Sequence, residues 1–226
     1  MSGTPSVNLH PGVVTVLSSA GPLINLSLQV ASLGIAMDIN KRGSVGGLSP
    51  VPFVTLLMNC VIWSQYGLLK DNKTVYIPAL TGIVAAIFCS AIYDRYSKEV
   101  KKASLYRVAF GIIGASTALF MQEQSYLIGI MGCIISVCLL AAPLAALSTV
   151  LRDKSTASMP FSTSAINSLN VVVWLTYGLL VADDVMIWGP NVLGLFVCGA
   201  QMVLFAKFGI GGSSGSKANA PQKLQM

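Results

Sequence analysis

The chain carries WSQYGLL at residues 63–69 and WLTYGLL at residues 174–180, a separation of 174 − 63 = 111 residues. The same offset pairs Ser44 with Ser155 further upstream. A repeat unit of this length is too long for a solenoid and suits half of a helical bundle. In a membrane protein built from two parallel repeats, the substrate site lies near mid-bilayer at the repeat interface. The repeat therefore indicates where a site should be sought.

The composition is that of an integral membrane protein. Of 226 residues, 54% are hydrophobic and 10% are charged, and the mean hydropathy is +0.73. An average soluble domain carries about 25% charged residues. A membrane-spanning helix needs about 20 apolar residues. Seven such spans are predicted, at 12–36, 51–69, 74–93, 103–122, 125–150, 160–181 and 185–206. They leave no room for a soluble catalytic domain, so an enzyme is not expected.

The basic residues fall in alternate loops. One set of loops holds only Lys70 and Lys73. The other set and the C-terminus hold Lys41, Arg42, Arg95, Lys98, Lys101, Lys102, Arg107, Arg152, Lys154, Lys207, Lys217 and Lys223. Because basic loops stay in the cytosol, the N-terminus is predicted outside and the C-terminus in the cytosol. The net charge of +6 therefore reflects topology, and no nucleic-acid partner is expected.

The repeat leaves one helix over. Residues 12–93 are predicted to form a first three-helix repeat and residues 125–208 a second. Since three is odd, the second repeat would insert upside down without a spacer, so the span 103–122 is predicted to be an inverting linker. Residues 209–226 are rich in Gly and Ser and are predicted to be a disordered cytosolic tail. The predicted fold is thus an all-α membrane protein of seven transmembrane helices, arranged 3+1+3 with parallel repeats.

The interiors of the predicted spans contain no Asp, Glu, Lys, Arg or His. Ion-coupled pumps usually need an ionisable relay inside the membrane. Metal chemistry and acid–base catalysis need the same kinds of group. We therefore expect a neutral substrate that moves without ion coupling, and no metal or cofactor.

Amide and indole groups are the candidate ligands within the spans. Asn191 offers two donors and an acceptor with two lone pairs, which suits a hydroxyl-rich neutral ligand. Trp63 and Trp174 occupy equivalent repeat positions, and indole faces pack on apolar faces of ligands while the N–H donates. A single membrane Trp is more often an interfacial anchor, but an equivalent pair favours a pocket. Leu28 and Leu139 also repeat at 139 − 28 = 111, although core packing alone would explain them.

Two further sets of residues suggest moving parts. Tyr66 and Asp184 are predicted near the outer face, where a phenol–carboxylate hydrogen bond could close an outer gate. A solvated loop acid is the competing interpretation of Asp184. Pro52, Pro143 and Pro160 lie at the predicted cytosolic ends of their spans. Proline bends a helix, and several prolines at matched depth favour hinges over isolated kinks.

A set of short motifs extends through both halves of the chain. They are RGSV at 42–45, LLMNC at 56–60 and the stretch 63–69 in the first half, and APL at 142–144, MPF at 159–161 and PN at 190–191 in the second. As a set they resemble the SWEET (MtN3/saliva) family of sugar transporters, over about residues 12–208. SWEETs are themselves a known example of parallel repeats. The resemblance implies sugar uniport by alternating access, with homo-oligomers as one implied state.

The resemblance also implies a central pocket lined from both halves. It implies an Asn from each half, of which Asn191 is one. It implies lining residues at the positions of Trp63, Trp174, Leu28 and Leu139, where bulky side chains suit hexose-type members better than sucrose-type members. The outer gate and the proline hinges carry over in the same way.

The sequence departs from the family pattern at two positions. Ala79 stands where the resemblance implies the first-half Asn, so one central amide is missing. A lost hydrogen bond to a neutral partner costs about 0.5–1.5 kcal/mol, and Thr81 or Asn59 could compensate. Ser32 stands where the first-half proline often sits, so a stiffer first half is expected.

Three other classes of membrane protein each fit part of the sequence. A related PQ-loop-type transporter of another small neutral solute is the main alternative, because Ala79 weakens the sugar site. A seven-helix receptor would explain Asp94-Arg95-Tyr96 at 94–96 but would not contain the repeat. A retinal protein needs a mid-helix Lys, and Lys207 lies at a helix end. The expected partners are a sugar and membrane lipid. The plasma membrane is favoured, with the Golgi or another internal membrane left open.

Overall fold

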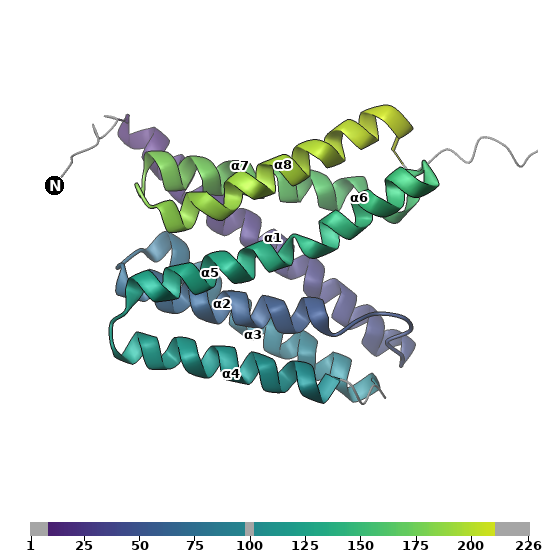
Figure 1. Cartoon of the computed structure of the whole chain (residues 1–226), viewed down its shortest axis with the longest axis horizontal. Coiled ribbons are helices and arrows are strands. Elements are labelled where there is room, and N and C mark those ends of the chain that lie inside the picture. The colour runs from purple at the N-terminus through teal and green to yellow at the C-terminus, as the bar shows by residue number, and fades with distance from the viewer. Residues whose placement is uncertain (1–8, 98–101, 211–226) are drawn as a thin grey trace, which may run out of the picture.

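The computed structural model describes residues 9–97 and 102–210, and every regular element within those segments is a helix (Figure 1). The elements are α1 (Pro11–Arg42), α2 (Val51–Leu69), α3 (Lys73–Tyr96), α4 (Lys102–Met121), α5 (Ser125–Leu139), α6 (Ala141–Asp153), the 3₁₀ helix η1 (Thr156–Ser158), α7 (Phe161–Leu180) and α8 (Val185–Phe208). Six of the described segments are long and apolar enough to cross a membrane, with 125–153 counted as one. The seventh predicted span corresponds to α7, a helix of 20 residues that is not among those six. Most of the predicted tail, 211–226, lies outside the described residues.

The helices form two bundles that pack against each other through α1 and α7 and through α2 and α5. In the first bundle α3 packs on both α1 and α2, and in the second α8 packs on α5, α6 and α7. The linker α4 packs on α2 and α5. We call the end that carries Pro11 and the α2–α3, α4–α5 and α7–α8 connections the N-terminal end, and the opposite end the C-terminal end (Figure 1).

The fifth predicted span, 125–150, corresponds to the apolar segment Ser125–Asp153, but its helix is divided in two. The α5 helix stops at Leu139, and α6 begins at Ala141. Pro143 has no N–H to bond the carbonyl of Leu139, and its ring crowds that carbonyl. The chain tightens at the junction, where the Leu140 N–H donates to the Val137 carbonyl at 3.0 Å. The helix therefore divides just before the proline.

The equivalent helix of the first repeat, α1, is continuous from Pro11 to Arg42. It runs beyond the predicted 12–36 because its last turn carries Lys41 and Arg42, and cations stabilise a helix C-terminus. It ends at Gly43, whose φ of 65° is the left-handed conformation that glycine adopts without strain. Where the second repeat has Pro143, α1 has Ser32, whose hydroxyl donates to the Leu28 carbonyl at 3.2 Å.

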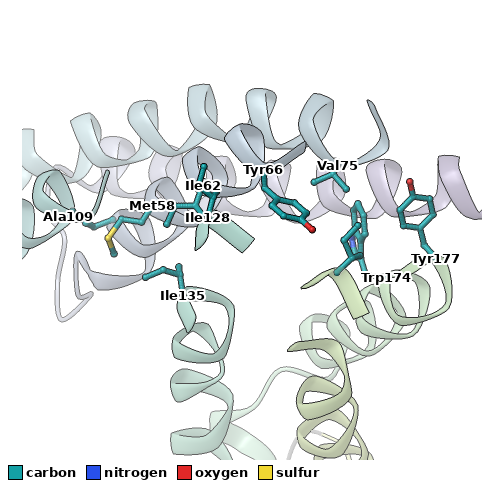
Figure 2. Close-up of a cluster of buried hydrophobic side chains, with 11 residues drawn as sticks. Met58, Ile62, Tyr66, Val75, Ala109, Ile128, Ile135, Trp174 and Tyr177 are labelled. Atoms are coloured by element: carbon teal, nitrogen blue, oxygen red, sulfur yellow. The ribbon is translucent and has the colours of Figure 1, made fainter. Parts of the chain in front are cut away.

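The main hydrophobic core lies between the two repeats. Figure 2 shows Met58 and Ile62 of α2 near Ile128 and Ile135 of α5, and Trp174 of α7 near Val75 of α3. Burial of a large apolar side chain is worth about 1.5–3 kcal/mol. In lipid, however, close packing has to hold helices together. The buried core therefore joins α2 of the first repeat to α5 of the second.

Two equivalent glycines allow the tight hairpins at that end. A Cβ built on Gly67 would lie 2.8 Å from the backbone N of Tyr76, and one on Gly178 would lie 2.8 Å from the backbone N of Trp188. No real side chain tolerates such contact with backbone, so α2 and α7 approach the next helix only because these positions lack a Cβ. The repeat in sequence is thus also a repeat in packing.

Candidate binding cavity

A cavity of about 440 Å³ lies between the repeats. This volume falls in the range of about 300–1,000 Å³ that is typical of small-molecule sites. Among the described residues that line it, none is Asp, Glu, Lys, Arg or His. All six predicted substrate-binding residues line it, namely Leu28, Trp63, Ala79, Leu139, Trp174 and Asn191. The structure therefore brings the predicted set together, and their binding role stays a prediction.

The two indoles are held across the repeat boundary. The Trp63 Nε1–H donates to Ser136 Oγ at 3.1 Å, and the Trp174 Nε1–H donates to Asn25 Oδ1 at 3.3 Å. The acceptors are equivalent residues, since 136 − 25 = 111. Each repeat thus supplies an indole to its partner and accepts one in return. Both rings are fixed by a hydrogen bond at one edge and leave apolar surface toward the cavity.

A pair of glycines makes room for these rings. A Cβ on Gly132 would lie 3.1 Å from Trp63 Cε2, and one on Gly21 would lie 3.0 Å from Trp174 Cζ2. These glycines are also equivalent, because 132 − 21 = 111. Each indole therefore lies against the bare backbone of α1 or α5. A side chain at either glycine would push the ring into the cavity.

Amides supply the polar surface of the cavity. The Asn191 Nδ2 donates to the Ile187 carbonyl at 2.7 Å, which leaves its second N–H and its oxygen for a ligand. The Ser136 hydroxyl donates to Asn59 Oδ1 at 3.2 Å. The repeat equivalent of Asn59 is Asn170, which has a buried Oδ1 without a hydrogen-bond partner among the described residues. Asn59 therefore bonds between helices, and Asn170 presents an unused acceptor.

Two tyrosines join the repeats near the N-terminal end. The Tyr66 hydroxyl donates to Asp184 Oδ2 at 2.6 Å, which is the predicted contact, and the Tyr177 hydroxyl donates to Asn72 Oδ1 at 2.9 Å. Asn72 and Asp184 are equivalent at an offset of 184 − 72 = 112. Each also caps its helix, because Asn72 accepts from the Val75 N–H and Asp184 accepts from the Met186 N–H. Both hairpin turns are therefore fastened to the opposite repeat.

The C-terminal end lacks such a closure among the described residues. The α6 helix packs on α5, η1 and α8 but not on α1, α2 or α3. In Figure 1, α6 and the end of α8 diverge from the first bundle. The cavity lining continues in this direction to Ser32, Pro143 and Gln201. The structure is thus closed at the N-terminal end, while the repeats stand apart at the C-terminal end.

The comparisons with known proteins agree with this architecture. The profile of the family described as "Sugar efflux transporter for intercellular exchange" matches residues 15–101 and 126–210, which leaves the linker region unmatched. The chain belongs to this family, the SWEETs. Their activity is transport, so the protein is not an enzyme.

Individual SWEETs match along most of their length. "Sugar transporter SWEET1" of Drosophila pseudoobscura pseudoobscura is 30% identical over 74% of this chain and 77% of its own. "Bidirectional sugar transporter SWEET7" of Arabidopsis thaliana is 30% identical over 89% of this chain and 82% of its own. A solved eukaryotic SWEET transporter matches with a TM-score of 0.72 at 24% identity, covering 85% of this chain and 95% of that one. The last likeness confirms the predicted fold.

The three proline positions of this SWEET differ in their structural setting. Pro143 lies at the α5–α6 break and lines the cavity. Pro52 is the second residue of α2, and Pro160 is the N-cap of α7. Proline is well tolerated at the start of a helix, so these two bend no helix. Of the predicted hinges, only Pro143 interrupts an otherwise continuous span.

Several site residues of this SWEET were missed by sequence reasoning. Asn25 and Ser136 were not singled out, although the offset of 111 pairs them. Tyr177 and Asn72 were not predicted to meet, although the repeat maps the Tyr66–Asp184 pair onto them. Gln29 lines the cavity and was also missed. It had no signal in the repeat, because its equivalent, Leu140, is apolar.

Proposed function

We propose that this SWEET moves a monosaccharide such as glucose across a membrane without ion coupling. The observation that carries the proposal is the cavity itself, in which two fixed indoles and several amides meet, with no Asp, Glu, Lys, Arg or His among the described residues that line it. Apolar walls with a few placed hydrogen-bonding groups are typical of sites for small neutral ligands. A relay for protons would need titratable side chains inside the membrane. The names of the relatives, which are called sugar transporters, support the same substrate class.

The sugar would lie between Trp63 and Trp174. The indole faces would pack on the C–H faces of the ring, and Asn191 would bond hydroxyls with its free N–H and its oxygen. Leu28 and Leu139 line the same space and narrow it. This bulk favours a hexose over a disaccharide.

Transport would proceed by alternating access. If the N-terminal end faces outward, as the distribution of basic loops predicts, the structure is an inward-facing state. The Tyr66–Asp184 and Tyr177–Asn72 contacts would then form the closed outer gate, and they would break in the outward-facing state. The α5–α6 junction at Pro143 is the natural hinge for closing the C-terminal end. In this scheme the membrane is the plasma membrane, and the substrate gradient sets the direction.

The test is radiolabelled glucose flux in cells deficient in hexose transport, with and without a protonophore. We expect flux from the wild type that survives the protonophore, and a severalfold rise in KM for Asn191→Ala because an amide contact is lost. Phe196→Leu is the matched control on the lipid-exposed face of the same helix, and it should leave KM unchanged.

Two outcomes would overturn parts of this proposal. Flux that collapses with the proton gradient would exclude uncoupled transport. A correctly inserted wild type that moves no monosaccharide would refute the substrate and would favour a related transporter of another small neutral solute. Competition by unlabelled amino acids and sugars in the same cells would then distinguish the solute classes.

A further inference from the structure

The first repeat has a gap in its polar lining. Ala79 is the repeat equivalent of Asn191, since 191 − 79 = 112, and it offers the cavity only a methyl group. If the proposed sugar site were built from symmetric contacts, the first half would lack its amide. Ala79 itself is almost fully buried, so its surroundings are filled by another side chain.

That side chain is Gln29, which reaches from α1 to the segment around Ala79. Its Nε2 donates to the Pro78 carbonyl at 2.9 Å, and its Oε1 accepts from the Thr81 hydroxyl at 3.1 Å. The Thr81 hydroxyl also lies 2.9 Å from the Pro78 carbonyl, so its single proton is shared between the two acceptors. A Cβ on Gly82 would lie 3.0 Å from Nε2, so the bare backbone at that glycine leaves room for the amide. Gln29 is thus fixed between Pro78 and Thr81, which lie before and after Ala79 in the sequence.

The amide retains hydrogen-bonding capacity after these contacts. A glutamine carries two N–H donors and an oxygen with two lone pairs. Gln29 uses one donor on Pro78 and one lone pair on Thr81. One of each is left, and Gln29 lines the cavity. Asn191 is in the same condition, because one of its donors is anchored on a helix carbonyl and the rest of its amide is free.

Folding alone does not account for Gln29. The equivalent position of the second repeat is Leu140, because 140 − 29 = 111, so the architecture accepts an apolar residue there. A buried polar group is costly in an apolar environment unless it is bonded. The amide is bonded at Pro78 and Thr81, and its remaining donor and lone pair offer a ligand hydrogen bonds that a leucine could not make.

The geometry points to Gln29, held by Thr81, as the first-half amide that binds hydroxyls of the transported solute in place of the side chain missing at Ala79. This inference rests on the proposed function and adds a specificity determinant to it.

The two amides lie at different depths. The Asn191 amide is anchored on the carbonyl of Ile187, whose equivalent in α3 is Val75. The Gln29 amide is anchored on the carbonyl of Pro78, which is three residues, or about 4.5 Å, beyond Val75 along α3. The site would therefore bond hydroxyls that are offset along the transport axis.

The experiment measures KM for glucose and for a series of monodeoxyglucoses in hexose-transport-deficient cells. Gln29→Leu restores the residue type of the second repeat and should raise KM for glucose about two- to tenfold. It should also abolish the preference for glucose over the one deoxyglucose that lacks the hydroxyl bound by Gln29. A loss of folded protein would not change this preference. Thr81→Val should act in the same direction more weakly. Ser27→Leu, on the exposed face of α1, is the matched control and should change neither quantity.

A second variant completes the test. Ala79→Asn should change the wild type little, because Gln29 already supplies the amide, but it should recover transport in the Gln29→Leu background. An unchanged KM and unchanged deoxyglucose ranking in Gln29→Leu, with a raised KM in Asn191→Ala, would overturn this inference and leave the proposed function standing. An inserted wild type that moves no sugar would overturn both.

Discussion

The two repeats are nearly symmetric at the N-terminal end and differ toward the C-terminal end. At the N-terminal end each repeat gives a tyrosine to the opposite hairpin and an indole to the opposite first helix. Toward the C-terminal end α1 is continuous, whereas the equivalent α5–α6 is broken before Pro143. The contacts at the N-terminal end therefore come from both repeats, whereas the broken helix is found in the second repeat.

The largest expected effect comes from exchanging the residues that make this difference. Ser32→Pro would remove a backbone N–H and crowd the Leu28 carbonyl, and such a change inside a helix costs about 3 kcal/mol. We expect the thermal unfolding midpoint in detergent to fall clearly. Pro143→Ala restores the missing hydrogen bond and should not lower that midpoint, but it should slow glucose exchange by stiffening the junction.

The control for both variants is Ser27→Ala, which changes an exposed hydroxyl on α1. If Ser32→Pro were as stable as the wild type, α1 would already accommodate a bend and the asymmetry would not arise from this residue. If Pro143→Ala exchanged glucose at the wild-type rate, the α5–α6 junction would not be the hinge.

Much of this comparison could be predicted from the sequence, and the missing parts have physical reasons. The offset of 111 placed Trp63 and Trp174 on one cavity, because equivalent residues of a parallel repeat face the same axis. The break at Leu140 was missed, since an apolar run shows how far a span extends but not whether its backbone is continuous. Gln29 was missed because a single amide among apolar residues has no periodic signal, and its contacts lie on another helix.

The two tyrosine contacts of the proposed gate should give an effect of intermediate size. Tyr66 bonds a carboxylate, whereas Tyr177 bonds an amide at the equivalent position. Hydrogen bonds to charged groups are worth about 1.5–3 kcal/mol, and those between neutral groups about 0.5–1.5 kcal/mol. Tyr66→Phe should therefore open the N-terminal end more than Tyr177→Phe. The measurement is the rate at which a maleimide applied from the N-terminal side labels the half-buried thiol of Cys133.

Tyr126→Phe serves as the control, because this tyrosine is exposed at the same end of the bundle. Equal labelling rates in the two gate variants would mean that the charge of Asp184 does not strengthen its contact. A faster rate for Tyr177→Phe would reverse the comparison and would make the neutral pair the principal lock.

The smallest expected effect concerns the two asparagines behind the indoles. Asn59 accepts a hydrogen bond from Ser136, whereas the Oδ1 of its equivalent, Asn170, has no partner among the described residues. Asn59→Leu should lower the free energy of unfolding by about 0.5–1.5 kcal/mol, because a hydrogen bond is lost. Asn170→Leu removes an acceptor that bonds none of the described residues, so it should leave stability unchanged or slightly higher while raising the KM for glucose. Thermal unfolding with and without glucose separates the two effects: glucose should raise the midpoint of Asn59→Leu more than that of Asn170→Leu.

Equal loss of stability in both variants would show that Asn170 is already bonded in the absence of glucose, for instance through water. The two repeats would then be more alike behind the indoles than their direct contacts indicate.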